Sequence, residues 1–199
     1  ATDSYRMAIR DIPGTEILSR DEIVLVPSRA LDVVKRVLNE DKELTVVLGE
    51  KEAVFKIGNT SIVTRLIEGE FPNYKGLIPE KNKNKLVINR EETLAALQRV
   101  KLLAREATPV RLFMNDKKIE LLAIEQDIGQ ATEIIEGNYS GEEITVAFNP
   151  DYLIDGLEVI STKEVTLETT DALKPAILKG LDEETFLYLL MPLNGQQLF

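Results

Sequence analysis

The side chains of this sequence that could do acid–base chemistry are carboxylates and cations, because the chain has no histidine and no cysteine. Their absence excludes disulfides, thiol nucleophiles, a Ser-His-Asp triad and nearly all zinc sites. A pair of carboxylates, as in glycosidases, is the simplest enzymatic alternative that is left. Neighbours such as Glu142 and Glu143 occur by chance in a chain with 34 acidic residues. The spacing of a calcium-binding loop is also missing. We therefore predict a protein without catalytic activity, metal or cofactor.

The charge of the chain limits its contacts with nucleic acid. The net charge is 24 − 34 = −10, and no lysine or arginine lies between Lys118 and Lys163. Such a surface repels phosphate, so contact with DNA would need a separate basic face. The longest apolar run, Phe186 to Leu193, is too short to cross a bilayer, and no signal peptide opens the sequence. We expect a cytoplasmic protein that does not enter a membrane.

A stiff, apolar stretch divides the chain. The residues from Phe71 to Pro79, FPNYKGLIP, combine two prolines with large apolar side chains. Proline removes a backbone donor and disfavours helix before it, so this stretch should be extended and should lie against other residues. The polar run from Glu80 to Lys85 that follows is typical of a surface linker. These features predict a domain boundary near residue 82.

The elements around this boundary repeat. Three stretches show a strand, a cap, a helix and then three antiparallel strands, and their opening strands are expected at Ile23, Leu86 and Ile144. Asn89 with Glu92 predicts a capping box, and Asn149 before Pro150 predicts the start of the third helix. The expected strands cover residues 1–12, 22–26, 43–48, 53–57, 61–67, 85–88, 110–114, 119–125, 131–136, 144–148, 165–168, 176–179 and 185–191. The fold class is therefore α+β, with helices on one face of antiparallel sheets.

Four stretches together resemble one family, the bacterial DNA polymerase III beta subunits, or sliding clamps. They are ATDSYRMA at Ala1 to Ala8, FPNYKGLIP, NYSGEEITVAFNPDYLIDGL at Asn138 to Leu157, and YLLMPL at Tyr188 to Leu193. The repeated β-α-β-β-β unit is this family's building block, so the resemblance implies the DNA-clamp fold. It further implies that residues 1–82 are part of the middle clamp domain, that residues 83–193 are the third domain, and that residues 194–199 are a tail.

The resemblance also implies how the chain assembles. Family members form a ring homodimer around double-stranded DNA, which they hold without sequence specificity. By resemblance, this chain lacks the first domain and part of the middle one, so we expect it not to close a ring and to be a monomer.

The resemblance implies a hydrophobic pocket between the middle and third domains. In the family this pocket receives QLxLF-type motifs of DNA polymerase subunits, the clamp loader and repair proteins. Before any family argument, Met191 and Leu193 are more simply core residues, and Arg6 a surface ion pair. Matching positions in this sequence are Thr2, Ser4, Tyr5, Arg6, Met7, Pro72, Gly76, Leu77, Leu173, Pro175, Leu189, Met191, Pro192 and Leu193.

Two further expectations follow from the resemblance. Basic residues on or after the helices would face DNA, the alternative being a solvated helix face; they are Lys35, Arg36, Arg99, Lys101 and Arg105. The closing GQQLF resembles the pocket's own ligand motif, which suggests that Phe199 docks into a neighbouring copy, unless the tail has no role or comes from cloning. An α+β scaffold that binds other peptides, unconnected with DNA, is the alternative function.

Overall fold

The computed structural model of this chain describes residues 1–12, 23–39, 43–79, 81–104 and 108–193. The chain divides into two units, which we describe separately. The first unit comprises Ala1–Pro13 and Tyr74–Phe199, and the second comprises Gly14–Asn73. The tail predicted to dock and the basic Arg105 lie outside the described residues.

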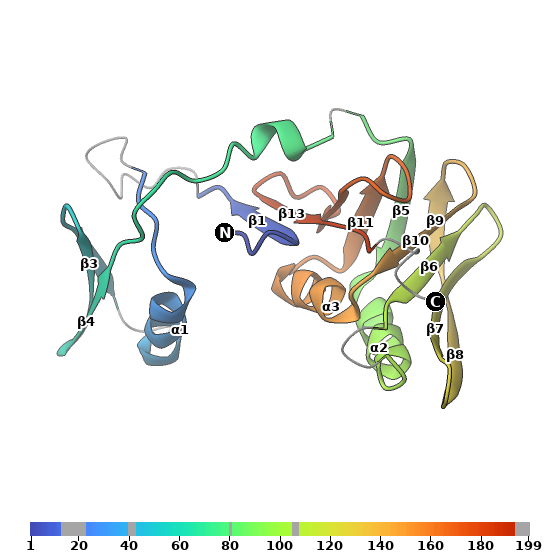
Figure 1. Ribbon diagram of the computed structural model, residues 1–199, viewed down its shortest axis with the longest axis horizontal. Helices are drawn as coiled ribbons and strands as arrows, with labels where there is room; N and C mark the ends of the chain where they lie inside the picture. Colours follow the sequence, from blue (N-terminus) through green and yellow to red (C-terminus); the bar gives the residue numbers. More distant parts are fainter. Residues whose placement is uncertain (13–22, 40–42, 80, 105–107, 194–199) are drawn as a thin grey trace. The chain divides into compact units, whose positions relative to one another are not determined.

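The second unit is one helix with a three-stranded antiparallel sheet in the order β2-β3-β4 (Figure 1). Its elements are α1 (Ser28–Val37), β2 (Leu44–Leu48), β3 (Glu52–Ile57) and β4 (Thr60–Arg65). The apolar face that the sequence predicts on α1 contributes Val34 to a small core with Ala53, Phe55 and Ile57. The hairpin predicted at Gly58 forms, and this glycine has a φ of 58°, which side chains other than glycine rarely adopt.

The first unit contains two antiparallel sheets, with orders β1-β13-β12-β11-β5-β9 and β10-β6-β7-β8. Two helices, α2 and α3, accompany them (Figure 1). The elements are β1 (Arg6–Arg10), the 3-10 turn η1 (Lys75–Leu77), β5 (Asn84–Asn89), α2 (Arg90–Lys101), β6 (Val110–Met114), β7 (Ile119–Glu125), β8 (Gly129–Ile135), β9 (Gly137–Ser140), β10 (Ile144–Phe148), α3 (Pro150–Val159), β11 (Glu164–Thr169), β12 (Ala176–Gly180) and β13 (Phe186–Leu190).

The two halves of this unit exchange their opening strands. Strand β5 precedes α2 but pairs with β11, which follows α3, and Leu86 stands opposite Leu167. Strand β10 precedes α3 but pairs with β6, which follows α2, and Val146 stands opposite Leu112. Because each half completes the sheet of the other, both sheets and both helices share one core.

The predicted helix starts are confirmed. The Asn89 side chain accepts a hydrogen bond from the Glu92 amide at 3.1 Å. Asn149 accepts one from the Asp151 amide at 2.9 Å, with Pro150 in the first position of α3. Each cap satisfies an amide that the first turn of a helix leaves without a partner.

Two strand predictions were wrong or incomplete, and one strand was missed. Residues 23–26 are not a strand, because they have no neighbouring strand in the described part of the chain; the Leu25 carbonyl accepts one backbone bond, from Ile67. Residues 1–5 form a turn before β1, in which Ser4 has a φ of 76°. The short strand β9 was not predicted, because its sequence, GNYS, shows no apolar alternation. Among the described residues, no helix is both long and apolar enough to cross a membrane.

Candidate functional site

A row of buried apolar side chains crosses the edge of the six-stranded sheet. Met7 on β1 stands opposite Leu189 on β13, and Leu189 stands opposite Ile177 on β12. All three are buried, with 4%, 3% and 4% of their surface exposed. Their neighbours Tyr188 and Leu190 belong to the main core. Because successive side chains of a strand point to opposite faces, the row lies on the face turned away from that core.

A second, more exposed row continues from the ends of the same strands. The Tyr5 carbonyl accepts a hydrogen bond from the Met191 amide at 2.9 Å. Ala176 pairs with Leu190, so Pro175 and Met191 are the next residues along the two strands. Tyr5 is 58% exposed and Met191 37% exposed. The strands therefore place Met191 between Tyr5 and Pro175, where a ligand could reach it.

A surface hollow of about 340 Å³ adjoins this second row. The 3-10 turn η1 contributes Gly76 and Leu77 to its wall, and the loop between β11 and β12 contributes Pro175. Pro79, Lys81, Thr170 and Lys174 complete the lining. Leu77 is 48% exposed and Leu173, on the same loop, is 64% exposed. Apolar side chains left this open beside a hollow are typical of a binding surface.

An aspartate shapes the loop that carries Leu173 and Pro175. One carboxylate oxygen of Asp171 accepts hydrogen bonds from the amides of Leu173 and Lys174, both at 2.9 Å. The bond from the Leu173 amide is the largest cause that lowers the pKa of Asp171 below its ordinary value. The turn thus fixes the backbone next to the hollow.

Replacing Asp171 with alanine should loosen this loop and weaken any ligand held in the hollow. The substitution removes both bonds that Asp171 accepts from the amides of the loop. Because these bonds order the loop and do not contact the ligand, we expect a loss of affinity of about threefold to tenfold. Asp171→Asn keeps an acceptor oxygen and is the matched control. Titration of a peptide ligand measures both variants, and equal losses for Asn and Ala would show that the charge, and not the turn, matters.

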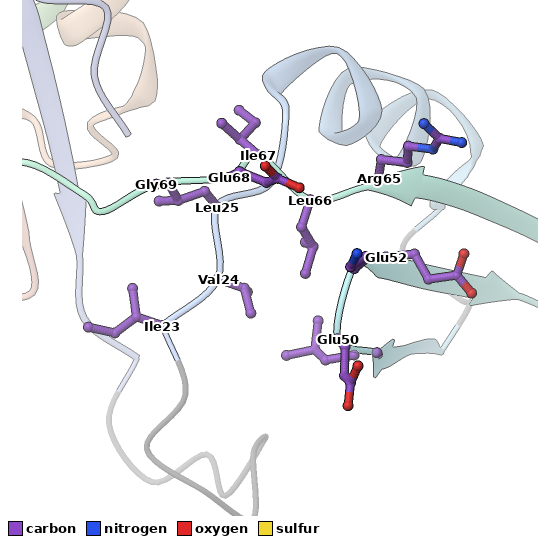
Figure 2. Close-up of a pocket in the computed structure, with 13 residues that line it drawn as sticks. Ile23, Val24, Leu25, Glu50, Glu52, Arg65, Leu66, Ile67, Glu68 and Gly69 are labelled. Carbon is purple, nitrogen blue, oxygen red and sulfur yellow. The ribbon is translucent and has the colours of Figure 1, made fainter.

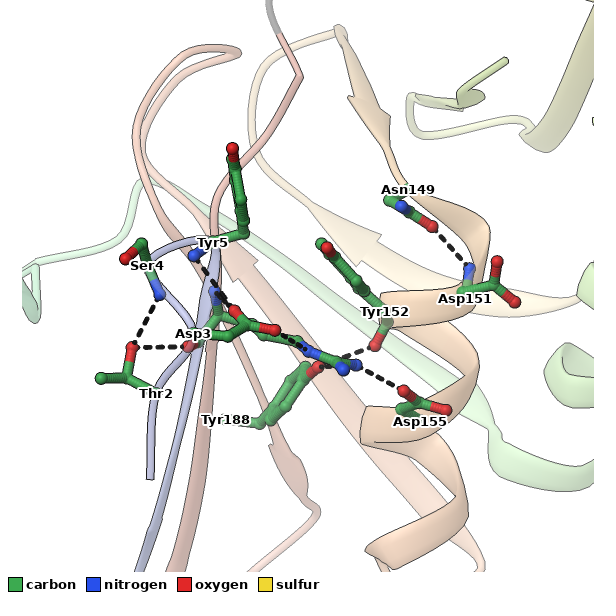
Figure 3. A network of polar contacts seen from close by, with 10 residues as sticks. Thr2, Asp3, Ser4, Tyr5, Asn149, Asp151, Tyr152, Asp155 and Tyr188 are labelled. Carbon is green, nitrogen blue, oxygen red and sulfur yellow. Dashed lines mark hydrogen bonds and ion pairs between the residues drawn. The ribbon is translucent and has the colours of Figure 1, made fainter. Parts of the chain in front are cut away.

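A polar network binds the start of the chain to α3 (Figure 3). The Arg6 side chain donates to Asp3 at 2.9 Å and to Asp155 on α3, and its Nη1 lies 3.4 Å from the Tyr188 hydroxyl. Its guanidinium carbon lies 4.2 Å from the ring centre of Tyr152, a cation–π geometry. The Tyr188 hydroxyl itself donates to the Tyr152 carbonyl at 3.0 Å.

The charges of this network stabilise one another. Burial lowers the pKa of Arg6, but hydrogen bonds with Asp155, Asp3 and Tyr188 outweigh it, so the pKa is raised overall. Burial also raises the pKa of Tyr188. Arg6 is therefore a permanent cation held between two carboxylates and an aromatic ring.

The same network orders the turn before β1 (Figure 3). Asp3 accepts hydrogen bonds from the amides of Tyr5 and Arg6, each at 3.1 Å. The Thr2 hydroxyl donates to the Arg6 carbonyl at 2.8 Å, and the Ser4 amide donates back to that hydroxyl at 3.3 Å. Thr2 and Ser4, both predicted site residues, therefore hold the backbone of the turn.

The structure places most of the predicted pocket residues in the first unit. Some lie on the face of the sheet turned away from the core, and others lie on the side of α3. Met7 and Leu189 lie on the face of the sheet opposite the core, whereas Arg6 contacts α3. Leu193 follows β13, and its amide donates to the Ala147 carbonyl on β10 at 2.8 Å. Pro72 is exposed and lies in the second unit. Whether these residues bind a ligand stays a prediction.

The basic residues predicted to face DNA differ in their surroundings. Arg99 makes two hydrogen bonds to Glu133, at 2.8 and 2.9 Å, and Lys101 pairs with Asp151 on α3. The hydrogen bond with Glu133 raises the pKa of Arg99. Lys35 and Arg36 are exposed in the last turn of α1. The paired carboxylates reduce the positive charge that α2 presents.

A larger hollow lies elsewhere, in the second unit, with a volume of about 1140 Å³ (Figure 2). Residues 23–25, 48–52 and 65–69 line it, and none of them is a predicted site residue. It is an open space beside the sheet and not a pocket with converging polar groups.

Sequence reasoning missed several residues of the candidate site. Asp3, Tyr152 and Asp155 hold Arg6, and Ile177 completes the buried row. The spacing of Tyr152 and Asp155 on one helix face was visible, but their partner is more than a hundred residues away. Ile177 lies in a strand that is buried on both faces, so alternation could not identify the face on which its side chain lies.

Two family models match this chain. One, described as "DNA polymerase III beta subunit, C-terminal domain", matches residues 75–194. The other, described as "DNA polymerase III beta subunit, central domain", matches residues 1–73. Together they cover nearly all of the described residues.

Relatives and solved structures agree with these matches. The beta sliding clamp of Bacillus subtilis (strain 168) is 32% identical over 203 residues, which are 98% of this chain and 53% of that protein. A crystal structure of the DNA polymerase sliding clamp from the same species has a TM-score of 0.88 at 32% identity, covering 98% of this chain and 52% of the other. A sliding clamp from Bartonella birtlesii bound to griselimycin has a TM-score of 0.90 at 27% identity, with coverages of 98% and 53%. The chain thus spans about half the length of these relatives.

Proposed function

Because the chain belongs to the DNA polymerase III beta subunit family, the sliding clamps, we propose that its candidate site binds short linear motifs of the QLxLF type. The observation that carries the proposal is the arrangement of Met191 between Tyr5 and Pro175, beside the hollow that Leu77 lines. Exposed apolar side chains on rigid elements around a hollow suit the apolar end of such a motif. The relatives bound to griselimycin support a ligand site on this fold.

The chemistry of the site suits partners that exchange. Met191, Leu77 and Leu173 are flexible or exposed and can repack around different side chains. Burying two large side chains gives about 1.5–3 kcal/mol each. After the cost of association, binding near the micromolar range is expected, about −8 kcal/mol. We propose DNA polymerase subunits, the clamp loader and repair proteins as the partners, all through such motifs.

The remaining roles are proposals of the same kind. We propose that residues 1–82 belong to the middle domain and residues 83–193 to the third, so that the middle domain contributes β1 to the sheet of the third. The complete protein would form a homodimeric ring in the cytoplasm around double-stranded DNA, and it would need no catalytic group. Contacts from Lys35 and Arg36 would then be directed at phosphates and sensitive to salt.

Titration of a fluorescent QLSLF-type peptide tests the site. We expect micromolar binding, and Leu77→Asp should raise the Kd at least tenfold because it places a charge in an apolar wall. Met191→Ala and Leu193→Asp should also weaken binding. Ile134→Asp is the matched control: its side chain is 66% exposed on β8, outside the candidate site, so binding should not change.

Two results would contradict the proposal. One is no binding at high micromolar peptide by a chain that circular dichroism shows to be folded. The other is binding that Leu77→Asp and Ile134→Asp affect equally. An α+β scaffold unconnected with DNA is not favoured, because the relatives named above are sliding clamps.

A further inference from the structure

The hollow beside Met191 carries positive charge in a chain that is strongly acidic as a whole. Lys81 and Lys174 belong to its lining, and none of the described residues that line it is a carboxylate. The net charge of the chain is −10, so its overall field repels anions. The two lysines therefore give this hollow the opposite sign to the chain around it.

The fold brings the two lysines to one place from distant parts of the chain. Asn84, at the start of β5, stands opposite Thr169, at the end of β11, so the segment before β5 runs beside the loop after β11. The Thr170 hydroxyl lies 3.4 Å from the Lys81 carbonyl oxygen. The backbone of Lys81 is thereby held next to the loop that carries Lys174.

Neither lysine is neutralised by a strong ion pair. Lys81 is exposed and makes no ion pair with any other described residue. Lys174 lies 3.5 Å from Asp171, but the two side chains are 62% and 49% exposed, and such a pair is weak. Glu168 on the neighbouring strand already pairs with Lys179 at 3.2 Å. Both ammonium groups are therefore available to a ligand.

We propose that this hollow selects linear motifs in which an acidic residue flanks the apolar end, with its carboxylate held by Lys81 and Lys174. This specificity rests on the proposed function, because it needs the apolar side chains of the motif to lie against Leu77 and Met191. A carboxylate between two ammonium groups makes charge-assisted hydrogen bonds, which are stronger than neutral ones. The lysines then discriminate among partners that share the apolar part of the motif.

An acidic peptide fits this hollow better than nucleic acid does. The same lining holds the apolar side chains of Leu77, Pro79 and Pro175. A polypeptide can present an apolar and an acidic residue next to each other, whereas a duplex presents its phosphates as a continuous row. Such a row needs a longer basic face than two lysines provide.

Titration with fluorescent QLSLF-type peptides is the first test. One peptide has neutral flanks, two carry a pair of glutamates either before or after the motif, and one carries lysines instead. At low salt, one of the acidic peptides should bind about threefold to tenfold more tightly than the neutral one, as exposed ion pairs allow. The lysine peptide should bind more weakly. The net charge of the chain alone would give the opposite order, so this order requires a local positive charge.

Substitution of the two lysines assigns the effect to the hollow. In the double variant Lys81→Gln, Lys174→Gln, the neutral and acidic peptides should bind with equal Kd. In Lys81→Glu, Lys174→Glu, the lysine peptide should become the tighter ligand. Lys117→Gln is the matched control: Lys117 is exposed on the turn between β6 and β7, outside the hollow, so the preference for the acidic peptide should remain.

The neutral peptide separates this inference from the proposed function. If it binds and neither acidic peptide binds more tightly, the inference is wrong and the proposed function stands. The same holds if the preference survives in the glutamine double variant. If no peptide binds, both are wrong. A short DNA duplex that displaces the acidic peptide but not the neutral one would assign the lysines to nucleic acid and would also overturn the inference.

Discussion

Gly156→Ala should lower the free energy of unfolding of the first unit by about 1–3 kcal/mol, the usual cost of overpacking a core. Gly156 lies inside α3 and is buried. A Cβ at this position would meet two ring atoms of Tyr188 at 2.6 and 2.7 Å and a methyl of Leu178 at 3.0 Å. The ring cannot easily move, because its hydroxyl is bonded to the Tyr152 carbonyl. The clash should outweigh the gain in helix propensity, which is at most about 1 kcal/mol.

Hydrogen exchange of core amides in the first unit measures this effect, because the two units need not unfold together. Gly76→Ala is the matched control. A Cβ on Gly76 meets no atom within 4 Å, so the same substitution there should be neutral or slightly stabilising. Equal stability of the two variants would show that the Tyr188 ring yields at little cost.

Gly156→Ala should also disturb the candidate site, through the Tyr188 ring. Tyr188 contacts both Gly156 and Arg6, so a displaced ring changes the position of the guanidinium. We therefore expect the exchange protection of β1 to fall along with that of α3. This link between a helix glycine and the first strand could not be derived from the sequence, since it depends on which ring packs where.

Local patterns predicted the elements whose partners are near in the sequence. Strands β6 and β7, which pair with each other as a hairpin, were predicted with their observed bounds, and the caps at Asn89 and Asn149 form as expected. These features depend on turn residues and on alternation, which act over a few positions.

Long-range pairing explains what the sequence did not reveal. The segment at Ile23 has the composition of a strand, but a strand requires a neighbour to pair with, and composition does not supply one. The resemblance indicated Arg6 as a site residue, but its contacts with Tyr152 and Asp155 required the coordinates. Pairing of β1 with β13 is likewise a property of the fold and not of either strand.

Arg6→Ala should release the first strand from α3. The substitution removes the bonds to Asp3, Asp155 and Tyr188 and the contact with the Tyr152 ring. We expect a local loss of about 1–2 kcal/mol, less than buried charge pairs give, because Asp155 is half exposed. The Met191 amide, bonded to the Tyr5 carbonyl, should then exchange about tenfold faster, since 1.4 kcal/mol is a factor of ten.

The loss of stability caused by Arg6→Ala should depend on pH, because the Asp3 carboxylate that pairs with Arg6 is protonated in acid. Burial raises the pKa of this carboxyl, but hydrogen bonds from the Arg6 side chain and from the Tyr5 and Arg6 amides lower it below its ordinary value. Because the pKa of Asp3 is lower in the folded than in the unfolded chain, its ionised carboxylate stabilises the fold above about pH 4. This stabilisation is lost as the pH falls through the folded pKa. The difference between the native chain and Arg6→Ala should therefore shrink in acid.

Arg10→Ala on the same strand is the matched control. Arg10 pairs with Glu183 and lies 5.8 Å from the Phe186 ring centre, but its side chain is 52% exposed. Glu183 is largely buried, with 12% of its side chain exposed, but Arg10 lies at the end of β1 away from Tyr5. Arg10→Ala should therefore change the exchange of the Met191 amide little. The exchange rate of the Met191 amide in Arg6→Lys should lie between the rates in Arg6→Ala and Arg10→Ala. Lysine keeps the positive charge but lacks the forked guanidinium that contacts both carboxylates. If all three variants exchange alike, the network around Arg6 does not hold β1 in place, and the exposed row at Tyr5 and Met191 is maintained by strand pairing alone.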